Sequence, residues 1–318
     1  MRVVWVKEFG GPEVLVAGEA PDPVAGPGQV LIDVAFANIT FVETQLRAGS
    51  TGPYRLDLPV IPGNGVGGVI VATGKGVDPE LVGVRVVTGL NGSGGYAERV
   101  VVGAEAPFVV RDGLALDDAV ALLADGRTAA ALMHAAGVTA GMRVLVEAAA
   151  GGVGSLLVQL AGAAGATVVA VAGGAGKVEL ARELGAAHAI DYSSADWAQR
   201  VRDEVGGVDI VFDGVGGEIG ASAFGLLGRG GWFFSYGLAS GAWTEVSEET
   251  AAARGVSIHR GSLGSPAELR RFTERVLVDA ANGRVRPVIG QRFPLTEAAQ
   301  AHRAIETRAT LGKTLLVV

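Results

Sequence analysis

A glycine-rich turn between a predicted strand and a predicted helix is the part of this chain that could bind a phosphate group. Residues 143–149 read RVLVEAA, an apolar run typical of a buried strand, and residues 154–165 have helical periodicity. Between them, the spacing Ala149-x-Gly151-x-x-Gly154 follows the dinucleotide-binding pattern, with alanine in the first place. The glycines let the backbone approach a pyrophosphate, and the helix N-terminus favours its negative charge. We therefore predict a nucleotide site, with a glycine turn that serves packing alone as the alternative.

The residues after the next strand indicate which dinucleotide binds. An NAD site usually places Asp or Glu about 20 residues after the glycines, where it binds the ribose 2′-hydroxyl. Here residues 170–177 read AVAGGAGK, and no acid lies between Glu147 and Glu179. Because no carboxylate is expected at this loop, a 2′-phosphate would meet no repulsion, and Lys177 is near enough to pair with it. The sequence favours NADPH; a solvated lysine at a helix start is the alternative reading of Lys177.

The composition excludes several classes of protein. The chain has 318 residues, 49% of them apolar and 19% charged, which is enough for a sizeable core and two domains. A net charge of −7 argues against nucleic-acid binding. The charge-free stretch 148–176 is long enough for a membrane span, but glycines interrupt it, so we expect none. Cysteine is absent, and a cytoplasmic protein is the simplest interpretation.

The order of the predicted elements indicates one domain inserted into another. Residues 1–118 contain short apolar runs bounded by Gly and Pro, typical of buried strands. Over residues 119–261 strands and helices alternate, which predicts a parallel sheet with right-handed crossovers. Residues 262–318 return to a helix and a closing strand. We expect the last segment to rejoin the first domain.

Ordered motifs along nearly the whole chain resemble one protein family. They include FGGPEVL (9–15), IPGNGVGGVIVATG (61–74), GMRVLVEAAAGGVG (141–154), VFDGVGG (211–217) and HRAIETRATLGKTLLVV (302–318). Together they resemble the quinone oxidoreductase branch of the medium-chain dehydrogenase/reductase superfamily, which includes zeta-crystallin. The resemblance implies an α/β protein in which a Rossmann doubly wound parallel sheet domain is inserted in a GroES-like β-rich domain, with the active site between them. It also implies a homodimer paired through sheet edges, for which GGWFFSYG (230–237) is the candidate edge.

The resemblance also implies a set of cofactor contacts. The pyrophosphate would be held by Gly151, Gly152, Val153 and Gly154, which Ala149 precedes in the motif. The 2′-phosphate would lie by Gly173, Lys177 and Tyr192, and the nucleotide path would be lined by Val215, Gly237 and Ser240. Thr128 would lie near the nicotinamide, and Arg308 would reach the cofactor. For Tyr192, a half-buried strand residue without a ligand is the alternative.

A metal ion is not expected. Where the zinc-dependent branch has Gly-His-Glu, this chain reads Gly63-Asn64-Gly65, and its four histidines are scattered. Without a metal to polarise an alcohol, the plausible chemistry is hydride transfer from nicotinamide to a quinone or an enone, which delocalises the resulting charge to oxygen. Solvent can supply the proton, so we predict no catalytic side chain.

The substrate side departs from the family pattern. Thr40 stands where Asn is common, Gln45 where Tyr is common, Gly65 where Glu is usual and Leu238 where Asn is usual. Thr40, Gln45 and Tyr54 are the candidate pocket residues, although Tyr54 reads equally well as a surface loop aromatic. Three functions stay open: a quinone reductase, an enone or enoyl-thioester reductase of specialised metabolism, and an NADPH-binding protein without redox turnover.

Overall fold

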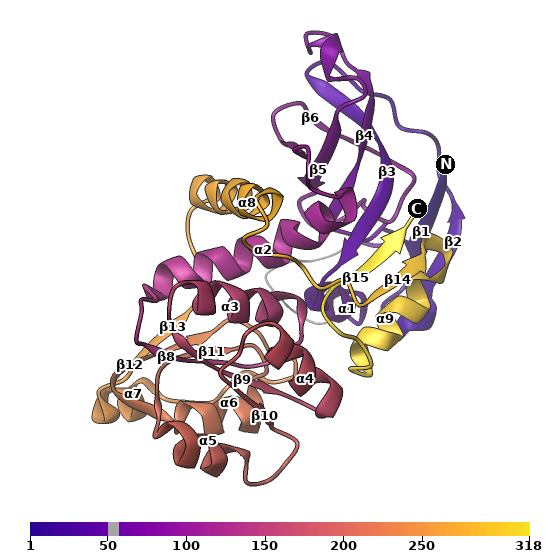
Figure 1. Cartoon of the computed structure of the whole chain (residues 1–318). Coiled ribbons are helices and arrows are strands. Elements are labelled where there is room, and N and C mark those ends of the chain that lie inside the picture. Colours follow the sequence, from indigo (N-terminus) through magenta and orange to yellow (C-terminus); the bar gives the residue numbers. More distant parts are fainter. Residues whose placement is uncertain (50–56) are drawn as a thin grey trace. The chain divides into compact units, whose positions relative to one another are not determined.

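The computed structural model describes residues 1–49 and 57–318. They form two compact units, one of residues 1–124 with 273–318 and the other of residues 125–272 (Figure 1). Helices α2 (Leu116–Ala136) and α8 (Pro266–Ala281) have residues in both units. The domain bounds expected from the sequence, 118/119 and 261/262, stay a prediction.

The unit of residues 125–272 is a doubly wound sheet. Its six parallel strands lie in the order β10-β9-β8-β11-β12-β13. The strands are β8 (Arg143–Val146), β9 (Thr167–Ala172), β10 (His188–Asp191), β11 (Val208–Asp213), β12 (Leu227–Ser235) and β13 (Ser257–Arg260). The helices are α3 (Gly152–Ala163), α4 (Ala175–Glu183), α5 (Trp197–Val205), α6 (Gly217–Phe224) and α7 (Glu248–Arg254). Figure 1 shows helices on both faces of the sheet, which confirms the predicted Rossmann class.

Strand order places the reversal point of this sheet between β8 and β11. The chain winds outward from β8 to β10 and then returns to the other side of β8 with β11. Ligands of open parallel sheets bind at such a point, beyond the carboxyl ends of the strands. Leu145, Val169 and Val211 are fully buried in these strands, because helices on both faces demand continuous apolar runs.

The edge of this sheet differs from the sequence-based expectation. GGWFFSYG forms β12, which lies between β11 and β13 and is not an edge. The strand at this end of the sheet is β13, whose residues 257–260 pair with β12 alone among the described strands, and β10 lies at the other end. The sequence motif was apolar because β12 is internal to the sheet, with Phe233 and Phe234 buried.

The other unit is β-rich. Its main sheet runs β14-β15-β3-β4-β5-β7, with β6 paired to β3, and β1 pairs with β2 in a second small sheet. The strands are β1 (Arg2–Val6), β2 (Leu15–Glu19), β3 (Gln29–Ile39), β4 (Gly65–Thr73), β5 (Arg85–Gly89), β6 (Arg99–Gly103), β7 (Phe108–Val109), β14 (Gln291–Pro294) and β15 (Thr314–Val317). The helices are α1 (Phe41–Arg47) and α9 (Ala298–Glu306), with 3₁₀ turns η1 (Pro12–Val14), η2 (Pro79–Leu81) and η3 (Leu295–Glu297). Because β15 pairs with β3, the end of the chain does rejoin the first segment.

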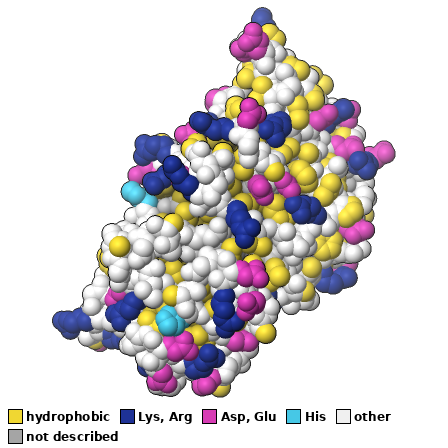
Figure 2. Space-filling model, in the orientation of Figure 1, with side chains coloured by type: hydrophobic (Ala, Val, Ile, Leu, Met, Phe, Trp, Pro, Cys, Tyr) yellow, Lys and Arg dark blue, Asp and Glu magenta, His cyan; other side chains and the backbone are white. Residues whose placement is uncertain are grey.

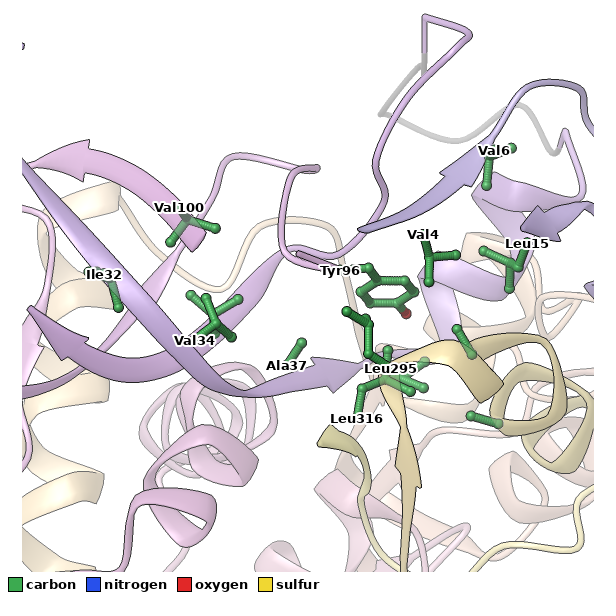
Figure 3. Close-up of a cluster of buried hydrophobic side chains, with 14 of the residues drawn as sticks. Val4, Val6, Leu15, Ile32, Val34, Ala37, Tyr96, Val100, Leu295 and Leu316 are labelled. Atoms are coloured by element: carbon green, nitrogen blue, oxygen red, sulfur yellow. The ribbon is translucent and has the colours of Figure 1, made fainter. Parts of the chain in front are cut away.

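Tyr96 lies in the core of the β-rich unit and carries a polar group into it. Figure 3 shows its ring among apolar side chains that include Val4 and Leu295. The Tyr96 hydroxyl is 2.8 Å from Nε2 of His302, which α9 contributes. This hydrogen bond pairs two buried polar groups that would destabilise the fold if they were left unpaired.

Acidification should destabilise this unit through His302. Burial first, and then the nearby Arg47 charge, lower the pKa of His302 from 6.5 to about 3. Between these values the unfolded chain binds a proton that the folded chain does not, so stability is lost as the pH falls below 6.5. We expect wild-type unfolding free energy to drop by about 1 kcal/mol between about pH 7 and about pH 5.5 through this group. Urea unfolding of His302→Gln should show a shallower pH dependence; equal slopes for both proteins would contradict the assignment.

Surface charges of both signs are mixed. Figure 2 shows dark blue and magenta side chains interleaved on the face in view, without one large basic area. Among residues 1–49 and 57–318, no helix combines the length and hydropathy needed to cross a bilayer.

Candidate nucleotide-binding site

The predicted glycine turn joins β8 to α3 at the reversal point of the sheet. Gly151 immediately precedes α3 in an extended conformation, with φ −86° and ψ 176°. No side chain caps this helix and its first turn holds no acid. The first N–H groups of α3 therefore have no intrahelical acceptor and favour an anion.

Close packing at the turn requires glycine. A Cβ on Gly154 would lie 2.8 Å from the carbonyl carbon of Ala148 and 3.0 Å from Cα of Ala149, and closer still to the Ala148 carbonyl oxygen. Ala148 itself has φ +46°, a conformation that is uncommon for a residue with a side chain. Ala149 is fully buried, and its N–H donates to the carbonyl of Val171 at 3.2 Å. The turn is thus held tightly against the ends of β8 and β9.

Gly152 and Val153 are predicted to contact a pyrophosphate. Gly152 and Val153 complete the first turn of α3, and a Cβ on Gly152 would lie 2.9 Å from Cγ of Asp125 on α2. That Cβ would lie closer still to Oδ2 of Asp125, so Gly152 also has no room for a side chain. Contact between the N–H groups of this turn and a pyrophosphate stays a prediction. Thr128, the residue expected near the nicotinamide, lies one helical turn after Asp125 on α2. Its contact with a nicotinamide stays a prediction.

A second loop brings together the residues expected at the 2′-phosphate. A Cβ on Gly173 would lie 3.0 Å from Cε2 of Tyr192, so the two residues are in contact. Lys177 is in the first turn of α4, where its N–H donates to the carbonyl of Gly174 at 3.1 Å. A Cβ on Gly174 would meet no atom within 4 Å. The loop between β9 and the first turn of α4 therefore contains two glycines, room beside Gly174, and Lys177. Contact of this loop with a phosphate stays a prediction.

The structure adds a carboxylate to this loop that the local sequence did not reveal. Asp191 ends β10, and its Oδ1 accepts the N–H of Gly174 at 3.0 Å and that of Ser193 at 2.8 Å. These backbone donors, Gly174 first, lower the pKa of Asp191. The earlier inference that no acid approaches this loop held for the stretch 148–178 only, because Asp191 arrives from the neighbouring strand.

Two turns beyond β11 and β12 pack on each other through backbone contacts. The N–H of Ser240 donates to the carbonyl of Val215 at 2.8 Å, and a Cβ on Gly237 would lie 2.7 Å from the carbonyl oxygen of Gly214. Val215 is buried, with 2% of its surface exposed. The structure therefore places Val215, Gly237 and Ser240 together beyond the carboxyl end of β11.

Beneath these turns lies a buried acidic pair that sequence reasoning missed. Glu147 follows β8 and Asp213 ends β11, and both are fully buried. The N–H of Val215 donates to Oε2 of Glu147 at 3.1 Å, and that of Gly216 donates to Oδ1 of Asp213 at 2.7 Å. The sequence did show an acid at the end of each of two apolar strands. That the two acids lie side by side follows only from the order of the strands in the sheet.

The remaining predicted residues belong to the β-rich unit. Thr40 precedes α1, and its N–H and hydroxyl both donate to Oε2 of Glu43 in a capping box. Gln45 is half-buried on α1, and Arg308 follows α9 with φ +57°. Tyr54 lies outside the described residues. The substrate and cofactor contacts of all four residues stay predictions.

The donor set does not fit a zinc ion. Asn64 stands where the zinc-dependent branch has histidine; its N–H donates to Oε1 of Glu43 at 2.8 Å, and its Oδ1 accepts the N–H of Gly92 at 2.6 Å. Asn64 therefore serves the local backbone. In the described part of the chain, no three His, Cys, Asp or Glu side chains gather as a metal-binding group.

Comparisons with known proteins agree with this geometry. The family described as zinc-binding dehydrogenase matches residues 152–277, and the alcohol dehydrogenase GroES-like domain matches residues 26–112. The chain is similar to a 2-haloacrylate reductase of Burkholderia sp, with 34% identity over 98% of this chain and 97% of the relative. It is also similar to a quinone oxidoreductase of Rattus norvegicus, with 33% identity over 100% of this chain and 98% of the relative. The structure of Escherichia coli quinone oxidoreductase complexed with NADPH aligns with a TM-score of 0.91 and 28% identity over the full length of both chains.

Proposed function

Because the chain belongs to the zinc-independent quinone oxidoreductase branch of the medium-chain dehydrogenase/reductase superfamily, we propose that it is an NADPH-dependent oxidoreductase that reduces a quinone or a related conjugated carbonyl acceptor. The observation that carries this proposal is the glycine turn at the reversal point of the sheet, with α3 beginning at Gly152. Relatives with the same fold are complexed with NADPH.

The residues of this chain would bind and orient the nucleotide. The N–H groups of Gly152, Val153 and Gly154 support the pyrophosphate, and Lys177 pairs with the 2′-phosphate. The turn that contains Val215 limits where the nicotinamide end can lie. When bound, NADPH supplies the hydride that the acceptor takes up.

An activated alkene is the second candidate acceptor. The 2-haloacrylate reductase among the relatives is named for a substrate with a carbon–carbon double bond conjugated to a carboxyl group. The substitutions at Thr40 and Gln45 also set this chain apart from the usual quinone reductase pattern. An enone, haloacrylate or enoyl thioester would accept hydride at carbon in the same way.

A screen of NADPH consumption distinguishes these acceptors. Purified protein is mixed with NADPH and with benzoquinone, naphthoquinone, a cyclic enone, 2-chloroacrylate or an enoyl thioester, and products are identified by mass. We expect turnover with at least one acceptor, with slower rates when NADH replaces NADPH. NADPH binding without turnover of any acceptor would favour the non-redox alternative, and failure to bind NADPH would overturn the proposal.

We also propose a homodimer in the cytoplasm. The β13 edge supports pairing with a second copy, since an unpaired strand edge is a template for another strand, and Trp232 on the adjacent strand is 44% exposed. Sedimentation of the purified protein at micromolar concentration would reveal a monomer if the dimer is wrong.

A further inference from the structure

Two buried carboxyl groups lie side by side at the reversal point of the parallel sheet. Strands β8 and β11 pair in parallel, with Val146 opposite Phe212. Glu147 and Asp213 are the next residues on each strand, and the N–H of Glu147 donates to the carbonyl of Phe212 at 3.1 Å. Both side chains are 0% exposed. Two negative charges on adjacent strands in a buried site would repel each other strongly.

The two carboxyl groups have different partners. Asp213 accepts three hydrogen bonds, from the N–H of Gly216 at 2.7 Å, the Ser235 hydroxyl at 3.0 Å and the Thr244 hydroxyl at 2.7 Å. Such donors stabilise its negative charge. In Glu147, Oε2 accepts from a backbone N–H, but Oε1 is buried without a donor in the described part of the chain. A proton on Glu147 would turn this acceptor into a donor toward Asp213.

The surroundings favour a neutral Glu147. Burial raises the pKa of Glu147 well above its usual range, and the charge of Asp213 and a hydrogen bond with it raise it further. Tyr236 follows β12, and its hydroxyl lies beside Gly214, since a Cβ there would be 2.6 Å from it. Burial, followed by the charges of Glu147, Asp213 and Asp125, raises the pKa of Tyr236. The ionisable groups that face the pair are thus acids.

The pair holds the backbone of the turn beyond β11. Val215 donates its N–H to Oε2 of Glu147, and Gly216 donates its N–H to Oδ1 of Asp213, so two consecutive amides are bound to the two carboxyl groups. The same turn accepts the N–H of Ala239 and of Ser240. Displacement of the pair would therefore move both turns.

We propose that Glu147 and Asp213 share one proton, held on Glu147, and that this carboxyl pair positions the turn Gly214–Gly216 for the nucleotide. The positioning role rests on the proposed NADPH site; the shared proton does not. Glu147 is a positioning residue that acts through the turn.

Three variants test the pair. Glu147→Gln replaces a neutral acid with a neutral amide that can still accept from Val215 and donate to Asp213, so we expect a Kd for NADPH within about threefold of wild type. Glu147→Ala leaves the turn amides and Asp213 without this partner, and we expect the Kd to rise by about tenfold or more. Glu218→Gln, the same change at an exposed position on α6, is the control and should bind like wild type.

Infrared spectroscopy detects a protonated carboxyl group directly, and the measurement needs no nucleotide. The wild-type minus E147Q difference spectrum at neutral pH should contain the carbonyl stretch of a protonated carboxyl group, and the wild-type minus E218Q spectrum should not. Absence of that band, or an E147Q variant as weak as E147A, would overturn the proposal. If wild-type protein fails to bind NADPH, the proposed function and the positioning role both fail, whereas the band still decides whether the proton is shared.

Discussion

Replacing Gly154 with alanine is expected to abolish NADPH binding. The new Cβ would press on the backbone of Ala148 and Ala149, at 2.8 Å and 3.0 Å from their carbonyl carbon and Cα respectively, and backbone cannot rotate away as a side chain can. Relief requires α3 to move from β8, which displaces the N–H groups that we propose hold the pyrophosphate. We expect the Kd to rise about 100-fold or more and the protein to lose about 1–3 kcal/mol of stability from overpacking.

Gly162 provides a matched control in the same helix. A Cβ there would meet no atom within 4 Å, and the residue is exposed. Gly162→Ala should bind NADPH like wild type and gain up to about 1 kcal/mol of stability from helix propensity. Calorimetric titration and urea unfolding of both variants provide the test. If Gly154→Ala bound NADPH as tightly as Gly162→Ala, α3 would not be the pyrophosphate site.

Replacing Lys177 with alanine is expected to remove the preference for NADPH. A lysine in the first turn of α4 faces the positive end of the helix dipole, an arrangement that is unfavourable by about 0.3–1 kcal/mol. The loss of a charge-assisted hydrogen bond to the 2′-phosphate should raise the Kd for NADPH by about tenfold or more.

Two comparisons make this result specific. Binding of NADH, which has no 2′-phosphate, should change little in Lys177→Ala. Lys75→Ala, an exposed change in the β-rich unit, should affect neither nucleotide. An equal loss of NADH and NADPH affinity would mean that Lys177 supports the fold of the loop and does not read the phosphate.

Local sequence patterns predicted the strands and the glycine turn of the proposed phosphate site. Residues 143–146 and 167–172 are strands because both faces of a parallel sheet are covered and their apolar runs are unbroken. The glycine at position 154 has a local explanation, since a Cβ there would meet Ala148 and Ala149, whereas the neighbour that excludes a side chain at Gly152 is Asp125 on α2. Contacts between residues close in the sequence can be predicted from one sequence.

The features that were missed depend on the order of the strands. Glu147 and Asp213 are 66 positions apart and become neighbours only because β11 returns to β8. Asp191 reaches Gly174 only because β10 lies next to β9. The edge was assigned to β12 for the same reason: an apolar strand does not reveal whether another strand follows it in the sheet.

The insertion of β15 between β14 and β3 has a consequence for synthesis on the ribosome. Residues 125–272 are one continuous segment, and all six parallel strands emerge before translation ends. The sheet of the β-rich unit, in contrast, waits for Thr314–Val317, which is made after residues 125–272, to pair with β3, which is made before them. Vectorial folding thus completes the nucleotide-binding unit first, while β3 emerges long before its final partner exists.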